Sequence, residues 1–281
     1  MSTMTMSIRF WGVRGSIATP GPETAKVGGN TSCVEVRCGG TTIVLDAGTG
    51  IRALGDALIR EGRAGVVTLL LSHLHWDHIQ GLPFFVPAYL PGTRLEVMGP
   101  GPERTSVADV LAEQMKTPVF PVRLQDLASQ LTMKDLEDGE TFEAGAARVT
   151  AARLNHPGGS LGYRIEYEGF TVAYATDTEM GDGVDAALVE LARDADVLIV
   201  DAQYTSEEYV SKVGWGHSTW EQCCELAREA CVGELVLFHH DPRRDDAAVE
   251  AMERAAREEF ASVRAAREGD RIELGRLADA A

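Results

Sequence analysis

One stretch of sequence decides the fold of this chain: Val66-Val67-Thr68-Leu69-Leu70-Leu71-Ser72-His73-Leu74-His75-Trp76-Asp77-His78. Its first six residues are apolar or β-branched and predict a buried strand. In a turn that leaves a strand, residues i and i+2 can point the same way, so His73 and His75 can share one metal ion. Asp77 and His78 can then serve a second ion beside it. Four potential ligands in six residues disfavour the alternative, an ordinary cluster of surface histidines.

All seven histidines of the chain fall in four short segments of this kind. The other four are His156, His217, His239 and His240, and the first two are flanked by glycine or proline. Imidazole is the commonest metal ligand in proteins. Neutral imidazoles combined with carboxylates suit Zn²⁺, Mn²⁺ or Fe²⁺.

Further candidate ligands come from the ends of later apolar runs, because four local residues cannot complete two coordination shells. His156 follows residues 148–154, Asp177 follows residues 171–175 and His239 follows residues 234–238. Taken singly, each has an ordinary alternative as a loop or turn residue. As a set, they follow one rule, an apolar run and then a ligand.

The remaining pattern predicts one domain over residues 1–281, built from short strands with helices between some of them. A sandwich of two mixed sheets with helices outside fits this order. Residues 99–145 have the least clear pattern, and they could form a lid or pack at a dimer interface. Ser218 and Glu221 have capping-box spacing at the start of a helix that reaches Ala230. The expected strands are residues 8–11, 33–36, 42–45, 66–71, 95–98, 148–154, 162–167, 171–175, 197–200 and 234–238, and the other expected helices are residues 51–59, 107–115, 185–192 and 246–260.

Composition limits the class of partner. The chain has 43 acidic and 26 basic residues, for a net charge of −17. Such a surface repels polyanions, which counts against DNA and long RNA but leaves a small phosphorylated ligand open. Five cysteines without a CxxC pair, no leader and no membrane-length apolar run predict a cytoplasmic protein with no membrane association.

The order of the candidate ligands resembles that of the metallo-β-lactamase superfamily over about residues 8–245. The resemblance implies a four-layer αβ/βα sandwich with a dinuclear site on its edge. It implies two divalent ions per chain, Zn²⁺ first and Mn²⁺ as the alternative, with a residue behind the histidine loop that orients it. The implied roles are His73, His75 and His156 for one ion, Asp77, His78 and His239 for the other, Asp177 as the bridge and Asp46 as the orienting residue.

Two positions indicate the branch of the superfamily. His75 stands where the di-iron oxidoreductase branch usually has Glu, which favours hydrolysis over redox chemistry. Asp177 stands where many secreted β-lactamases have Cys, which counts against antibiotic hydrolysis.

Three further segments resemble tRNase Z and its phosphodiesterase relatives: Phe10-Trp11-Gly12-Val13-Arg14-Gly15-Ser16 with Gly28-Gly29-Asn30-Thr31-Ser32, then Leu198-Ile199-Val200-Asp201-Ala202, then Gly216-His217-Ser218-Thr219. The resemblance makes His217 a catalytic residue that acts on the phosphate, with Asp201 as its acidic partner in place of the family's Glu. His217 would serve as general acid, and Asp77 is the third predicted catalytic residue. The alternative for His217 is a structural role at the start of the following helix.

The glycine-rich loop predicts substrate contacts from Ser16, Asn30 and Thr31, although it could be only a tight connection. His239 and His240 compete for the last ligand position. The resemblance favours His239, which leaves His240 to face the substrate or support the ligands.

These features predict a phosphodiesterase for a small phosphodiester, with a cyclic nucleotide or related cyclic phosphate as the leading substrate class. Only a short hairpin separates His156 from Asp177, where tRNase Z often has a tRNA-gripping insertion. The alternatives are a tRNase Z-like nuclease, a thioester or lactone hydrolase, and a non-catalytic metal-dependent nucleotide sensor. A homodimer is expected from the resemblance alone.

Overall fold

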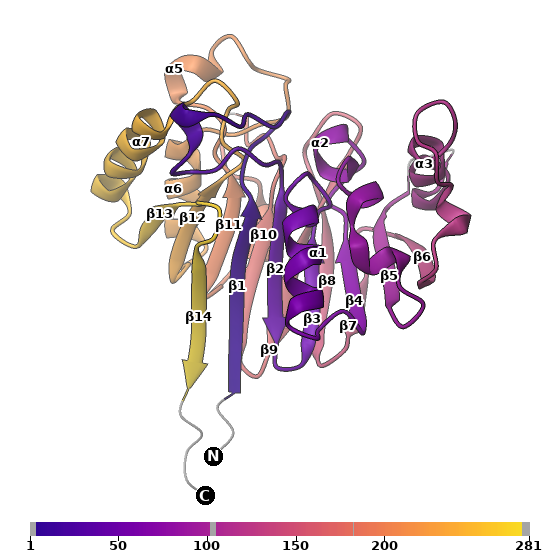
Figure 1. Ribbon diagram of the computed structural model, residues 1–281. Helices are drawn as coiled ribbons and strands as arrows, with labels where there is room; N and C mark the ends of the chain where they lie inside the picture. Colours follow the sequence, from indigo (N-terminus) through magenta and orange to yellow (C-terminus); the bar gives the residue numbers. More distant parts are fainter. Residues whose placement is uncertain (1–3, 102–104, 182, 277–281) are drawn as a thin grey trace, which may run out of the picture.

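The computed structural model describes residues 4–101, 105–181 and 183–276 (Figure 1). Within these residues the strands form two seven-stranded mixed sheets. In spatial order, the first sheet contains β14 (Arg271–Arg276), β1 (Met4–Gly12), β2 (Cys33–Cys38), β3 (Thr41–Leu45), β4 (Val66–Leu70), β5 (Arg94–Pro100) and β6 (Gln130–Leu136). The second contains β13 (Val263–Ala265), β12 (Glu234–Phe238), β11 (Val197–Asp201), β10 (Phe170–Ala175), β9 (Ser160–Tyr167), β8 (Ala147–Leu154) and β7 (Thr141–Ala144).

Helices cover the outer faces of both sheets, which confirms the predicted four-layer sandwich. On the first sheet, α1 lies over the outer face (Figure 1). Its buried residues Ile51, Leu54 and Leu58 belong to one apolar cluster with Val67 and Leu69 of β4. The helices are α1 (Ile51–Arg60), α2 (Trp76–Ile79), α3 (Val107–Gln114), α4 (Ala186–Ala192), α5 (Ser206–Tyr209), α6 (Trp220–Glu229) and α7 (Asp246–Glu259), and the 3₁₀ turns are Pro22–Thr24, Leu82–Phe84, Val86–Tyr89 and Leu124–Asp126. None of the described helices is both long and apolar enough to cross a bilayer.

The core between the sheets explains why the central strands read as continuous apolar runs. Phe10 and Val36 of the first sheet meet Tyr163, Tyr174 and Phe238 of the second, and all five are fully buried. A strand with the other sheet on one face and helices on the other has no face exposed to solvent, so its sequence shows no alternation of apolar and polar residues.

The topology brings the carboxyl ends of several strands to one edge. β3 and β4 run parallel in the first sheet, as do β10, β11 and β12 in the second. Asp46, Asp177 and His239 each follow such a strand with a positive φ, of 63°, 49° and 59°. Left-handed backbone is uncommon outside glycine and clusters at functional sites.

The structure corrects two details of the sequence analysis. Residues 99–145 contribute α3 and the edge strands β6 and β7, and β6 escaped detection because most of its side chains are exposed. The helix cap lies one residue later than predicted: Thr219 caps α6, with Gln222 as its reciprocal partner. The Ser218 hydroxyl donates to the carbonyl of Thr178 instead.

Candidate metal centre

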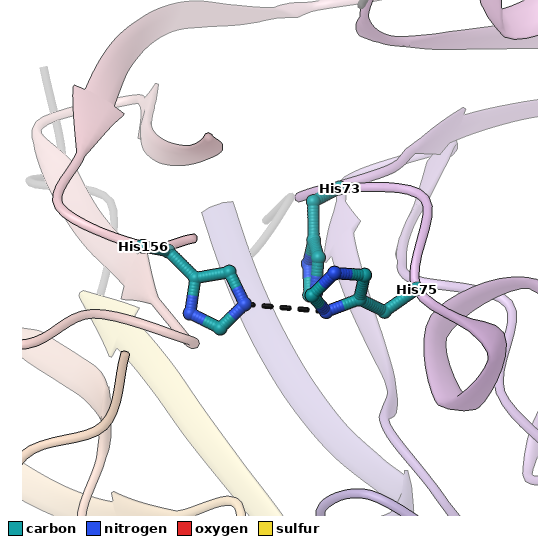
Figure 2. A group of neighbouring side chains, drawn as sticks. All are labelled: His73, His75 and His156. Carbon is teal, nitrogen blue, oxygen red and sulfur yellow. Dashed lines mark hydrogen bonds between the residues drawn. The ribbon is translucent and has the colours of Figure 1, made fainter. Parts of the chain in front are cut away.

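Three histidines from two loops converge at the sheet edge (Figure 2). His73 and His75 follow β4, and His156 follows β8. Nε2 of His156 lies 3.2 Å from Nδ1 of His75, and the His73 ring centroid lies 4.4 Å from that of His75 and 4.8 Å from that of His156. These are the three residues predicted to share one ion.

A second group, Asp77, His78 and His239, lies beside the first. Oδ2 of Asp77 is 3.1 Å from Nε2 of His78 and 3.3 Å from Nε2 of His239. His239, and not His240, therefore joins the cluster.

Asp177 stands between the two groups with one oxygen toward each. Its Oδ1 lies 3.2 Å from Nε2 of both His78 and His239. Its Oδ2 lies 3.6 Å from Nε2 of His73 and 3.9 Å from Nε2 of His156. A carboxylate in this position can serve two ions at once.

The donor atoms fit divalent metal ions. Nε2 of His73 and Nε2 of His78 are buried, and in the described part of the chain neither forms a well-aligned hydrogen bond. Burial disfavours the charged form of His78, yet the carboxylates of Asp77 and Asp177 raise the pKa of this histidine well above its ordinary value. The cluster therefore attracts positive charge and offers unsatisfied nitrogen atoms to it, which are the properties of a cation site.

Hydrogen bonds on the far side of the rings hold the nitrogens in place. Nδ1 of His156 lies 2.8 Å from the carbonyl of Gly216, and Nδ1 of His239 lies 3.0 Å from Oε1 of Gln203. Such partners fix the ring orientation and leave the other nitrogen for a metal. Gln203 was not predicted, because a lone glutamine after a strand carries no sequence signal.

Asp46 occupies the orienting position behind the histidine loop. Its Oδ2 lies 2.9 Å from Nδ1 of His78, and its two oxygens accept from the amide and hydroxyl of Ser72 at 2.7 and 2.9 Å. The hydroxyl of Tyr174 donates to Oδ2 at 2.7 Å from the other sheet. This buried carboxylate thus links the turn after β4 to β10.

The N-terminal glycine-rich loop reaches the cluster through its backbone. The amide of Ser16 donates to Oδ2 of Asp77 at 2.7 Å. A Cβ on Gly15 would lie only 2.5 Å from the His239 ring, so glycine is required by this close approach.

The side chains of two predicted substrate contacts lie inside the fold. Oγ1 of Thr31 is buried and accepts from the amide of Thr49. His240 is fully buried with Nε2 3.0 Å from the carbonyl of Ala266, and burial lowers its pKa to about 3. Asn30 donates to Glu268 and accepts from Thr49. Ser16 remains exposed and lines a cavity beside the cluster.

His217 and Asp201 belong to neither of these two donor groups, although the ligand atoms of His217 also lie within 4.8 Å of those of His156 and Asp177, and of those of Asp201 and His239. Nδ1 of His217 lies 2.6 Å from Oδ2 of Asp201 and 4.0 Å from Oδ2 of Asp177. Burial works against the imidazolium form, but Asp201 outweighs it and raises the pKa of His217 to about 9. Asp201 therefore reaches His217 although its side chain is shorter than the glutamate of the resembled motif.

The fold and the donor set together define a metal-dependent hydrolase class, and comparison with known proteins gives the family. The model of the beta-lactamase superfamily domain matches residues 41–240, so the chain belongs to this superfamily. The chain is 27% identical over 277 residues to ribonuclease Z of Mycobacterium avium (strain 104), covering 92% of each protein. It is 31% identical over 257 residues to an uncharacterised protein of Mycobacterium leprae, covering 89% of this chain and 84% of the relative.

A solved structure extends the likeness in fold. A diphosphatase of the PhnP family superimposes with a TM-score of 0.71 at 20% sequence identity, over 98% of this chain and 99% of that one. At this identity the likeness concerns the fold alone.

Proposed function

We propose that this protein is a dinuclear metal-dependent phosphodiesterase that hydrolyses a small phosphodiester. One observation carries the proposal: His217 lies 2.6 Å from Asp201 and 4.0 Å from Asp177, and neither of the two proposed sets of three donors needs it. Hydrolysis of a diester needs a proton for the departing alkoxide, and a histidine free of metal can deliver it. A thioester hydrolase has no such need, because a thiolate leaves without a proton.

The distances between donor atoms support two proposed ion sites, with Asp177 as the shared ligand. Zn²⁺ is the first expectation and Mn²⁺ the second, because imidazole and carboxylate donors accept both. When bound, a pair of such ions supplies an activated water and neutralises phosphate charge. The proposed ligands are His73, His75 and His156 at one site and Asp77, His78 and His239 at the other.

The protein's own groups hold and move the proton. Asp201 holds Nδ1 of His217, which leaves Nε2 free to donate to the leaving oxygen. The amides of Gln203 and Thr178 donate to Asp201 at 3.0 and 3.3 Å and fix its carboxylate. The ring is thus presented in one orientation before the substrate arrives.

A small substrate is favoured by the surroundings of the site. The loop from His156 to Asp177 contains only the hairpin of β9 and β10. The net charge of −17 opposes a long polyanion. A cyclic nucleotide or related cyclic phosphate remains the leading class.

A tRNase Z-like nuclease is the second candidate, since relatives named ribonuclease Z match nearly the whole chain. The deciding experiment presents the metal-loaded protein with 3′,5′- and 2′,3′-cyclic nucleotides and with a precursor tRNA that carries a 3′ trailer. Turnover of a cyclic nucleotide without trailer removal supports the proposal. Trailer removal without cyclic nucleotide turnover assigns the nuclease instead. Nucleotide binding with no turnover of any substrate favours a sensor.

The homodimer expected from the resemblance remains a prediction. Sedimentation at micromolar concentration checks it.

A further inference from the structure

A cavity of about 290 Å³ opens beside His217. Ser16, Tyr204, Lys212, Trp215, Asp241 and Arg243 contribute to its wall. It lies just below the range of about 300–1,000 Å³ for pockets that hold drug-sized ligands. It therefore has room for a substituent of a small substrate.

The charge of this cavity is opposite to that of the protein. Lys212 and Arg243 face it, and Asp241 is the only carboxylate among the described residues that line it. Nζ of Lys212 lies 3.8 Å from the centroid of the Trp215 ring, and within the described ranges Lys212 has no carboxylate partner. Arg243 contacts Asp241 at 3.3 Å, and its side chain is 77% exposed. In a chain with a net charge of −17, an uncompensated lysine at this place indicates an anionic ligand.

The carboxylate of Glu179 holds the part of the cavity wall that contains Lys212 and Trp215. Glu179 accepts from the hydroxyl of Tyr209 at 2.6 Å and from the amides of Gly214 and Gly216, both at 2.7 Å. These bonds fold residues 209–216 back onto the sheet edge. The cations are therefore placed in advance, which lowers the entropy cost of binding.

A second tie joins the two sides of the cavity. The guanidinium of Arg244 donates to Glu208 at 2.6 Å and to the carbonyl of Gln203 at 3.0 Å. The loop that contains Arg243 is thereby fixed to the loop that contains Lys212. Both cations can then act on one ligand group.

We propose that this cavity binds a second anionic, phosphoryl-type group of the substrate, and that Lys212 and Arg243 select substrates that carry it. Because His217 protonates the leaving oxygen and also lines the cavity, the second group belongs to the leaving half of the diester. Lysine and arginine are the side chains that commonly recognise phosphate oxygens. The inference rests on the proposed phosphodiesterase function and narrows its substrate to a diester with a second phosphate on the side of the leaving oxygen. A simple cyclic nucleotide lacks this group, whereas a further phosphorylated cyclic phosphate or a linear diester can carry it.

The kinetic test compares two dinucleotides, thymidylyl-3′,5′-thymidine and the same molecule with phosphates at both outer ends. Whichever half leaves, it carries a second phosphate in the latter compound only. We expect the wild type to prefer the phosphorylated compound by about tenfold in kcat/KM, and the Lys212→Ala/Arg243→Ala variant to lose that preference. The charge-matched control, Arg123→Ala/Arg193→Ala, removes two exposed surface arginines and retains the preference.

A binding test separates this inference from the proposed activity. Calorimetry measures the affinity of each metal-loaded protein for thymidine 3′,5′-bisphosphate and for thymidine 5′-monophosphate, with equal Tm values as the check on folding. If the wild type prefers the bisphosphate and the Lys212→Ala/Arg243→Ala variant does not, the result supports the proposed role of the cavity. This holds even if no diester is cleaved and the proposed activity fails. Diester turnover with the same preference for the phosphorylated dinucleotide in wild type and variant, or with no preference in either, would refute the proposed role of the cavity. The proposed phosphodiesterase activity would still stand.

Discussion

Nδ1 of His217 lies 2.6 Å from Oδ2 of Asp201, in a pair that the end of one strand and the start of one helix bring together. Asp201 is the last residue of β11, and His217 lies three residues before α6. The carboxylate also accepts from two backbone amides, so it cannot turn away from the ring. This geometry supports the proposal that His217 is the proton donor and Asp201 its positioning residue.

Replacement of His217 should affect substrates according to their leaving groups. For His217→Ala we expect kcat to fall by about 10²–10⁴-fold with an alkyl diester, because the alkoxide needs a proton. The loss should be much smaller with bis-p-nitrophenyl phosphate, because p-nitrophenolate leaves without one. Metal content, measured on the same sample, is the control. Equal losses with both substrates would refute the general-acid role.

Asp46 should be needed for stability as well as for the site. Asp46→Ala leaves the buried donors of Ser72 and Tyr174 unpaired and places alanine at a positive φ. We expect a loss of about 3 kcal/mol or more in the free energy of unfolding, measured with urea. The exposed Asp56→Ala is the matched control and should change it by less than about 0.5 kcal/mol. Similar values for the two variants would contradict the account of Asp46.

Gly15 should be required for metal binding at the Asp77 site. In Gly15→Ala the new methyl meets the His239 ring and displaces either that ring or the loop whose Ser16 amide supports Asp77. We expect zinc affinity at this site to fall by about 10–100-fold, as measured by competition with a chelating dye. Gly40→Ala, whose new Cβ would meet nothing within 4 Å, should bind zinc as the wild type does. Unchanged affinity in Gly15→Ala would refute the requirement.

Each donor group should account for one ion. His156→Ala and His239→Ala remove a ligand from different groups, so each should retain about one tightly bound ion where the wild type holds two. Elemental analysis after dialysis gives the count. Loss of both ions in both variants would show that the two sites do not bind independently.

Removal of the metals should lower stability. Without ions, the carboxylates of Asp77 and Asp177 remain buried close together, and the stabilisation that ligand binding gives to the folded state is lost. We expect chelation to lower Tm and Zn²⁺ to restore it, measured by calorimetry. A Tm that does not respond to chelation, in a sample shown to have lost its metal, would contradict a buried metal centre.

The sequence predicted the fold where chemistry and hydrophobic pattern coincide. An apolar run followed by a candidate ligand identified β4, β8, β10 and β12. A buried strand needs apolar residues, and a metal site at the sheet edge needs donor residues just after the strand ends. Edge strands gave no such signal: β6 is mostly exposed, and β13 has only three residues.

The surroundings of the proposed substrate contacts were harder to predict than the clustering of the candidate metal donors. Thr31 and His240 lie in suggestive motifs, but whether a polar side chain faces solvent or the protein depends on residues far away in the chain, such as Thr49 and Ala266. Glu179 and Gln203 gave no signal, because a single acidic or amide residue in a loop is ordinary. Only the three-dimensional arrangement shows what they hold.

The most direct test of the dinuclear phosphodiesterase is a metal titration of the metal-free protein, with bis-p-nitrophenyl phosphate as substrate and bound metal measured at each point. The account predicts that hydrolysis appears with bound Zn²⁺ or Mn²⁺ and reaches a plateau at two ions per chain. Two bound ions with no hydrolysis of this diester would contradict it.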